Sequence, residues 1–222
     1  MGIPLAAESQ TLQSIYRSLL DTHGRQYWWP GDSLFEIIVG AVLTQNTAWI
    51  NVEKAIDNLK QEGVLGLNHL LTLEEERLAD LIRPSGYFNV KARRLKNLCR
   101  FIQDMGGVES LDVLATDALR RELLTVNGVG PETADDILLY AYQRPVFVID
   151  AYTRRLFSRF GVISGDESYE ELRLGFQGAL GLNVELFNEY HALIVRHAKY
   201  RCTKTPACGN CCLSKKCKNY NI

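Results

Sequence analysis

The chain has 222 residues, of which 46% are hydrophobic and 23% charged, with a net charge of −1. This length suits one or two small domains with their own cores, and the composition is that of an ordinary globular protein. No apolar run reaches the ~18 residues that a membrane span needs, and the start carries no secretory pattern, so we expect a cytoplasmic protein that does not contact membranes.

Helix-start signals recur along the chain. The capping-box pattern is a Ser or Thr followed three residues later by Glu, and it predicts the first turn of a helix. An apolar stretch, 34–43, follows the first of these boxes directly. The three boxes are Ser33 with Glu36, Thr72 with Glu75, and Ser168 with Glu171.

Apolar residues then repeat at helical spacing through most of the chain, as with Val52, Ile56 and Leu59. The segment 144–150 is the one good strand candidate, and since one strand cannot form a sheet we interpret it as an extended connector. The fold class is therefore all-α. The segments expected to be helical are 34–43, 51–60, 90–102, 117–124, 131–142, 154–160, 170–180 and 186–199.

Positive charge is segregated although the net charge is small. Residues 91–100 include five basic residues and no acidic one, and no acidic residue follows Glu189. Such segments can present a basic face even on a chain that is nearly neutral overall. The alternative is that they are solvated helix faces and a charged tail.

Between 117–124 and 131–142 lies the turn Gly128-Val129-Gly130, followed by Pro131. Glycines let another molecule approach the backbone closely, and a helix start attracts anions. Pro131 suits the first helical position. However, three acidic residues follow directly, namely Glu132, Asp135 and Asp136.

Five of the six cysteines lie between 202 and 217, whereas Cys99 lies on an apolar helix face and is expected to be a buried core thiol. Disulfides are disfavoured in a chain without an export signal. The spacing offers either a zinc site or four thiolates around an iron–sulfur cluster, and it favours the cluster slightly. The four thiolates are Cys202, Cys208, Cys211 and Cys217.

Together, the glycine turn, the segment "VFVID" and the terminal cysteines resemble the endonuclease III family of helix-hairpin-helix DNA glycosylases. The resemblance implies two helical domains flanking a DNA-binding cleft. One is a helical barrel over 30–143 that contains the hairpin (about 117–142). The other combines 1–29 with 144–222 and carries a [4Fe–4S] cluster on the loop 202–217. The first cysteine gap is one residue shorter than the family's, and Cys212 is an additional thiol.

The resemblance also implies a partner, double-stranded DNA containing a damaged base, for a nucleoid-associated monomer. Hairpin amides at Gly128, Val129, Gly130 and Thr133 would bind a DNA phosphate, and basic residues from 91–100 and the cysteine loop would contact neighbouring phosphates. Asp150 would be the catalytic carboxylate, stabilising a cationic sugar. Its alternative role is a helix N-cap.

Glu132 occupies the position where bifunctional family members carry a lysine that attacks the sugar. A carboxylate cannot form an imine, so we expect base removal by hydrolysis without lyase activity. Glu132 also suits the first turn of a helix, where negative charge is favourable.

The segments "WWP" and "LTQNT" resemble the branch of the family that removes 3-methyladenine, which includes members without the cluster. Trp28 and Trp29 would stack on a flipped cationic purine, and Gln45 and Asn46 would fill the gap that it leaves. The alternatives are that the tryptophans anchor a core and that Gln45-Asn46 is a simple helix-ending turn.

The function predicted is a monofunctional DNA glycosylase of base excision repair that acts on alkylated purines. One alternative is a glycosylase for oxidised pyrimidines or mismatched bases. Another is a DNA-binding protein on the same fold without catalysis.

Overall fold

The computed structural model describes residues 5–220, and within that range it contains helices and no strand. The chain divides into two compact units. One combines the chain up to Trp29 with the chain from Pro145 onward, and the other is Pro30–Arg144. No helix among the described residues is long and apolar enough to cross a membrane.

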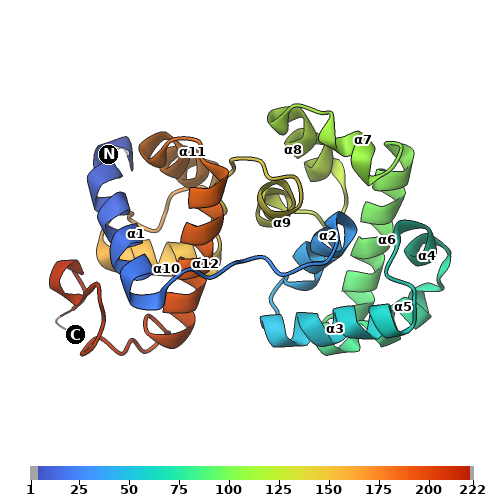
Figure 1. Cartoon of the computed structure of the whole chain (residues 1–222), viewed down its shortest axis with the longest axis horizontal. Coiled ribbons are helices and arrows are strands. Elements are labelled where there is room, and N and C mark those ends of the chain that lie inside the picture. Colours follow the sequence, from blue (N-terminus) through green and yellow to red (C-terminus); the bar gives the residue numbers. More distant parts are fainter. Residues whose placement is uncertain (1–4, 221–222) are drawn as a thin grey trace. The chain divides into compact units, whose positions relative to one another are not determined.

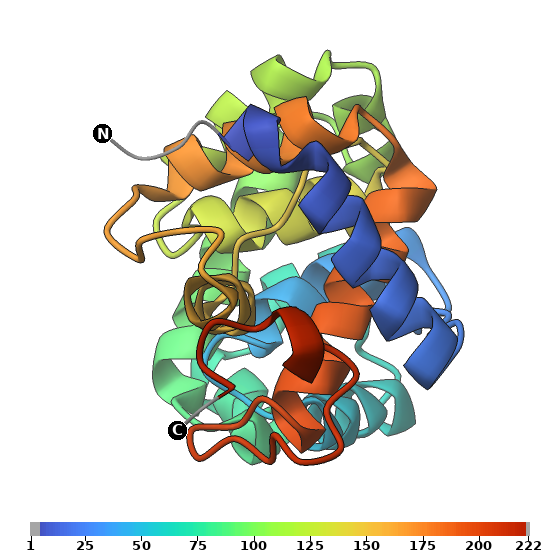
Figure 2. The same ribbon diagram turned by 90° about the vertical axis from the view of Figure 1, so that its left-hand side faces the viewer.

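The first unit is built around the two longest of its helices, α1 and α12, which run side by side (Figures 1 and 2). Its elements are η1 (Leu5–Glu8), α1 (Ser9–His23), α10 (Ala151–Phe160), α11 (Tyr169–Leu180), α12 (Val184–Tyr200) and η4 (Ser214–Lys216).

An aromatic cluster fills the core of this unit. Phe147 stacks on Phe176 with ring centroids 4.7 Å apart, and Phe157 meets the same ring edge-on at 4.8 Å. Tyr190 packs against Phe147 and donates its hydroxyl to the Leu12 carbonyl at 2.7 Å. Phe147 belongs to the extended connector, so this packing fixes the chain three residues before Asp150.

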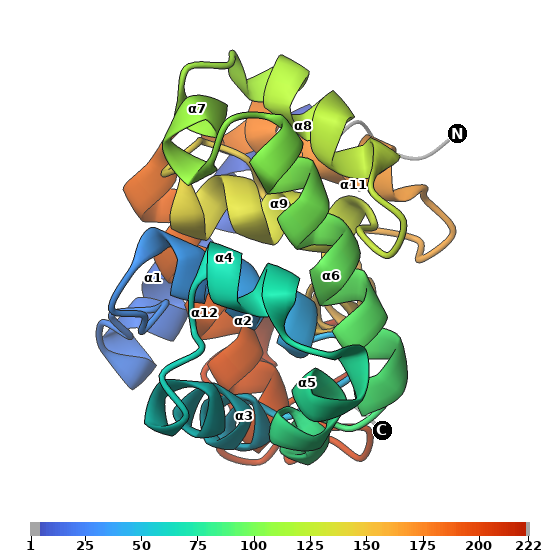
Figure 3. The same cartoon turned by 90° about the vertical axis from the view of Figure 1, so that its right-hand side faces the viewer.

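The second unit is organised around α2, whose sequence is apolar apart from Glu36, as expected for a helix that its neighbours cover. Figure 3 faces this unit and shows the long helix α6 beside α4 and α5. Its elements are α2 (Leu34–Leu43), α3 (Trp49–Gln61), α4 (Leu67–Thr72), α5 (Glu75–Leu81), η2 (Arg83–Ser85), α6 (Phe88–Asp104), α7 (Val108–Asp112), α8 (Thr116–Thr125), α9 (Pro131–Asp136) and the wider-turned η3 (Ile137–Ala141).

These helices confirm the periodicity-based predictions, and 144–150 is an extended connector as expected. Of the three predicted capping boxes, the one at Ser168 and Glu171 is complete. At Ser33 only half forms, since the Glu36 side chain accepts from the Asp32 amide instead of the Ser33 amide.

The predicted capping box at Thr72 and Glu75 was wrong. Thr72 ends α4, and its hydroxyl donates back to the Asn68 and His69 carbonyls. The helix after it, α5, begins without a side-chain cap. A Thr at the end of a helix can bond to the preceding turn, and this local bond competes with the capping arrangement.

Candidate functional site

The glycine turn joins α8 to α9, and its first glycine is required by the fold. Gly128 has φ +101°, and a Cβ there would lie 2.2 Å from the Cγ of Arg94 on α6. Around Gly130, by contrast, the described structure leaves a Cβ in open space. The Val129 amide donates to the Val126 carbonyl within the turn, at 3.0 Å. The turn is therefore held closely against α6 on one side and is open at Gly130.

Gln45 ties the loop after α2 to this turn. Its amide nitrogen donates to the Gly128 carbonyl at 3.1 Å and to the Thr133 hydroxyl at 2.8 Å. Arg94 donates to its amide oxygen. Both ends of the Gln45 amide are therefore engaged within the second unit, and the Thr133 hydroxyl is buried beneath it. Asn46, the next residue, is exposed and has φ +53°.

The buried Lys91 also binds the loop that follows α2. Lys91 is 1% exposed, and its ammonium donates to the Leu43 carbonyl at 2.7 Å, the Ser85 carbonyl at 2.8 Å and the Thr47 hydroxyl at 2.5 Å. Burial, with a smaller contribution from the charge of Arg94, lowers the pKa of Lys91 to about 8. Lys91 therefore connects the loop that carries Asn46 to the segment after α5.

The prediction that basic residues of 91–100 contact DNA phosphates was wrong for the two buried lysines. Lys91 binds the acceptors just described, and Lys96, 5% exposed, donates to the Leu71 and Leu73 carbonyls. Each ammonium is buried against oxygen atoms of the same unit and is therefore not available to DNA. The exposed cations of this segment are Arg93 and Arg100.

The acidic residues that follow the glycine turn have different environments. Asp135 is fully buried and forms a bidentate ion pair with Arg120 of α8, at 2.6 and 3.2 Å. Asp136 is also buried. Glu132 is exposed in the first turn of α9. Of the acidic residues in this helix, Glu132 is the one that solvent or a ligand can reach.

Asp150 lies at the junction between the extended connector and α10. Its Oδ1 accepts from the Thr153 amide at 2.7 Å, so Asp150 does have the alternative role of helix N-cap. Its Oδ2 lies 3.5 Å from Nε2 of His191 on α12. Burial raises the pKa of Asp150, but the hydrogen bond and charge of His191 and the Thr153 amide outweigh it, and the pKa is lowered overall. The structure thus keeps a nearly buried carboxylate ionised.

The adjacent tryptophans are half-buried at the end of the N-terminal segment of the first unit. Trp28 and Trp29 meet edge-on, with ring centroids 5.5 Å apart. Both residues are therefore partly accessible to solvent. Tyr27, beside them, is 82% exposed.

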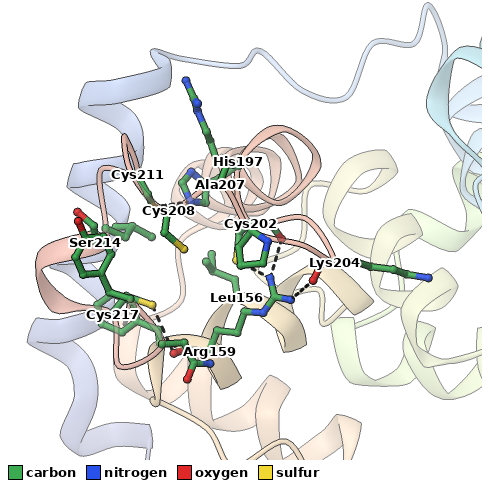
Figure 4. Close-up of a pocket in the computed structure, with 16 residues that line it drawn as sticks. Leu156, Arg159, His197, Cys202, Lys204, Ala207, Cys208, Cys211, Ser214 and Cys217 are labelled. Carbon is green, nitrogen blue, oxygen red and sulfur yellow. Dashed lines mark hydrogen bonds between the residues drawn. The ribbon is translucent and has the colours of Figure 1, made fainter. Parts of the chain in front are cut away.

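The four predicted cysteine ligands line one cavity of about 240 Å³ in the first unit (Figure 4). Cys202 follows α12, and the other three belong to the loop after it. Arg159 of α10 holds this loop by donating to the Thr203 carbonyl at 2.5 Å and the Lys204 carbonyl at 2.8 Å, and it lies 3.4 Å from the Cys202 sulfur. Cys212 is absent from the lining. Cys99 is buried in α6 as predicted, and burial raises its pKa to about 12.

Two glycine-linked helices, a capping aspartate after an extended connector and a cysteine-lined loop together define a helix-hairpin-helix protein of the DNA repair type. Residues 39–180 match the model of the HhH-GPD superfamily of base excision DNA repair proteins. The chain therefore belongs to this superfamily.

Three relatives illustrate its range. The chain is 49% identical over 214 residues to a Methanocaldococcus jannaschii protein named "putative DNA repair glycosylase", covering 93% of this chain and 97% of that one. It is 28% identical to endonuclease III of Sulfolobus acidocaldarius, covering 85% and 83%. The H. pylori 3-methyladenine DNA glycosylase bound to 1,N6-ethenoadenine superposes with a TM-score of 0.72 at 31% identity, covering 89% and 98%.

Proposed function

We propose that this protein is a monofunctional DNA glycosylase that hydrolyses the N-glycosidic bond of alkylated purines such as 3-methyladenine in double-stranded DNA. The observation that carries the proposal is the Asp150 carboxylate, which is nearly buried, ionised and held by the Thr153 amide and His191. A fixed negative charge of this kind stabilises the cationic, oxocarbenium-like sugar of glycosidic cleavage and can orient the attacking water.

The bound DNA would be positioned mainly by backbone groups. In this proposal the glycine turn supplies amides, chiefly at Gly128 and Gly130, to a phosphate beside the lesion. Asn46 fills the gap left by the flipped nucleotide, because its side chain is exposed whereas Gln45 is engaged with the hairpin. Gln45 then acts by holding the loop in place.

The choice of alkylated purines rests on charge. A 3-methylated adenine is cationic, and aromatic faces such as those of Trp28 and Trp29 attract cations. A cationic base also leaves without needing a general acid. The similarity to the H. pylori 3-methyladenine glycosylase supports this choice.

Oxidised pyrimidines and mismatched bases are the competing substrates, favoured by the similarity to endonuclease III. A panel of duplexes that contain 3-methyladenine, 1,N6-ethenoadenine, thymine glycol or a G·T mismatch separates the two under single-turnover conditions. The proposal expects the alkylated purines to be excised fastest. Preferential release of thymine glycol or of mismatched thymine would contradict the proposal and show that the competing bases are the substrates.

The absence of lyase activity is proposed from Glu132. An exposed carboxylate in the first turn of α9 cannot attack the sugar to form an imine. The product should therefore be an intact abasic site that is cut only after alkali. Efficient borohydride trapping of a protein–DNA adduct would show that a lysine elsewhere serves, and the enzyme would then be bifunctional.

The cysteine cavity fits a [4Fe–4S] cluster. Four thiols around one small cavity are the donor set that such a cluster requires, and Arg159 lies close enough to Cys202 to offset thiolate charge. Cys202, Cys208, Cys211 and Cys217 would hold the cluster, and it would fix the loop they share. Iron analysis of anaerobically purified protein, with about four irons per chain expected, tests this part independently of excision.

A further inference from the structure

A second group of metal-binding side chains lies beside the cysteine cavity and outside the proposed cluster ligands. It consists of His23, the last residue of α1, His197 of α12, and Cys212 of the cysteine loop. One nitrogen from each imidazole and the Cys212 sulfur all lie within 4.8 Å of one another. His197 is buried, and the other two residues are half-buried. Three segments distant in sequence thus bring two imidazoles and a thiol to one point.

The distance between the two imidazole nitrogens of this group is close to that in a zinc site. Tetrahedral zinc, with bonds of about 2.0 Å to nitrogen and 2.3 Å to sulfur, separates two nitrogens by about 3.4 Å and a nitrogen from a sulfur by about 3.6 Å. His23 Nε2 and His197 Nδ1 are 3.1 Å apart. Side-chain shifts of about 1 Å would bring all three atoms to coordination distance, leaving a fourth position for water.

The second nitrogen of His197 also has a suitable partner. Its Nε2 lies 3.5 Å from the sulfur of Cys211, as Figure 4 shows from the cavity side. Metal-bound histidines usually donate their other ring N–H to an acceptor, which fixes the tautomer. If Nε2 donates to the Cys211 thiolate, Nδ1 is left with a lone pair directed at His23 and Cys212.

We propose that His23, His197 and Cys212 bind one zinc ion, separate from the iron–sulfur cluster. Two neutral imidazoles and one thiolate form a donor set that zinc favours. The ion would join the end of α1 to the cysteine loop and would account for the fifth thiol, which the cluster does not use. Without a metal, the same contact is a hydrogen bond between the two imidazoles.

The test uses full-length protein without a histidine tag, purified anaerobically and supplied with one equivalent of zinc. Iron and zinc are counted by elemental analysis, and the zinc environment is measured by X-ray absorption at the zinc edge. The expected result is about four irons and one zinc per chain, with one sulfur at about 2.3 Å and the remaining zinc ligands nitrogen or oxygen. Zinc surrounded by four sulfurs would place it in the cysteine cavity and overturn the proposal.

Two variants and a control locate the site. Cys212→Ser and His23→Gln should each weaken zinc binding at least ~10-fold while the iron content stays unchanged. Gln can still donate to His197, so His23→Gln preserves the metal-free hydrogen bond. His69→Gln changes an exposed histidine of the other unit and should leave both metals unaffected. Equal zinc affinity in all four proteins, or no zinc uptake by iron-loaded wild type, would overturn the assignment.

Discussion

Replacing the Asp150 carboxylate by an amide separates its two roles. In Asp150→Asn the side-chain oxygen can still accept from the Thr153 amide, and Asn caps a helix about as well as Asp. The free energy of unfolding should therefore fall by less than ~1 kcal/mol. What the variant loses is the negative charge, which faces His191 and, in the proposed complex, the sugar.

The loss of rate can be estimated from that charge. Two opposite unit charges about 4 Å apart at an effective dielectric constant of about 20 interact by about 4 kcal/mol. If this attraction exists in the transition state alone, its removal slows base excision by about 10³-fold. Single-turnover excision from an alkylated duplex measures the rate, and a filter-binding or anisotropy assay measures DNA affinity, which should change little.

The control is Ser168→Ala, which removes the N-cap of α11 in the same unit. It should lower stability by about 1 kcal/mol and leave excision unchanged. An Asp150→Asn rate within ten-fold of wild type, at normal stability, would refute the electrostatic role and leave Asp150 as a cap.

Three further predictions follow from the same structure. Trp28→Ala or Trp29→Ala should reduce excision more for cationic purines than for neutral lesions, whereas equal losses together with a lowered melting temperature would indicate a core anchor. Cys208→Ser should abolish the visible absorption and the stoichiometric iron of the purified protein, while Cys212→Ser should retain both. Lys91→Met should lower the free energy of unfolding by at least about 2 kcal/mol, because it leaves the Leu43 and Ser85 carbonyls buried without their donor. In wild type, Lys91 makes stability rise as the pH increases from about 8 to 10.5, because the folded protein releases this proton before the unfolded chain does, and the pH dependence of Lys91→Met should lack that rise.

Most of the helices that could be predicted from the sequence bury a regular apolar stripe, as α3 does with Val52, Ile56 and Leu59. The cap at Asp150 could also be predicted, since a single Asp before a helical segment is a local signal. Both depend on residues close together in the chain.

The buried lysines that bind backbone oxygens could not be predicted in this way. Lys91 and Lys96 stand in a run of basic residues, which is typical of an exposed face, yet each is buried against backbone oxygens from another part of the chain. Lys96 donates to the Leu71 and Leu73 carbonyls at the end of α4, where a Thr72 cap was predicted. The residues that receive such an ammonium carry no charge or motif, so the pattern of side chains does not reveal them.

The acidic residues after the glycine turn likewise gave no sign of the arginines that lie close to them or to the turn. Arg120 of α8 neutralises Asp135 inside the unit, and Arg94 of α6 lies against Gly128 and binds Gln45. The turn is thus flanked by a cation, although the residues that follow it in the sequence are acids. Glu132 remains exposed at the first turn of α9. Under the proposed mechanism, Glu132 offers the sugar no amine that could attack it. Base removal therefore depends on water and on the carboxylate of Asp150.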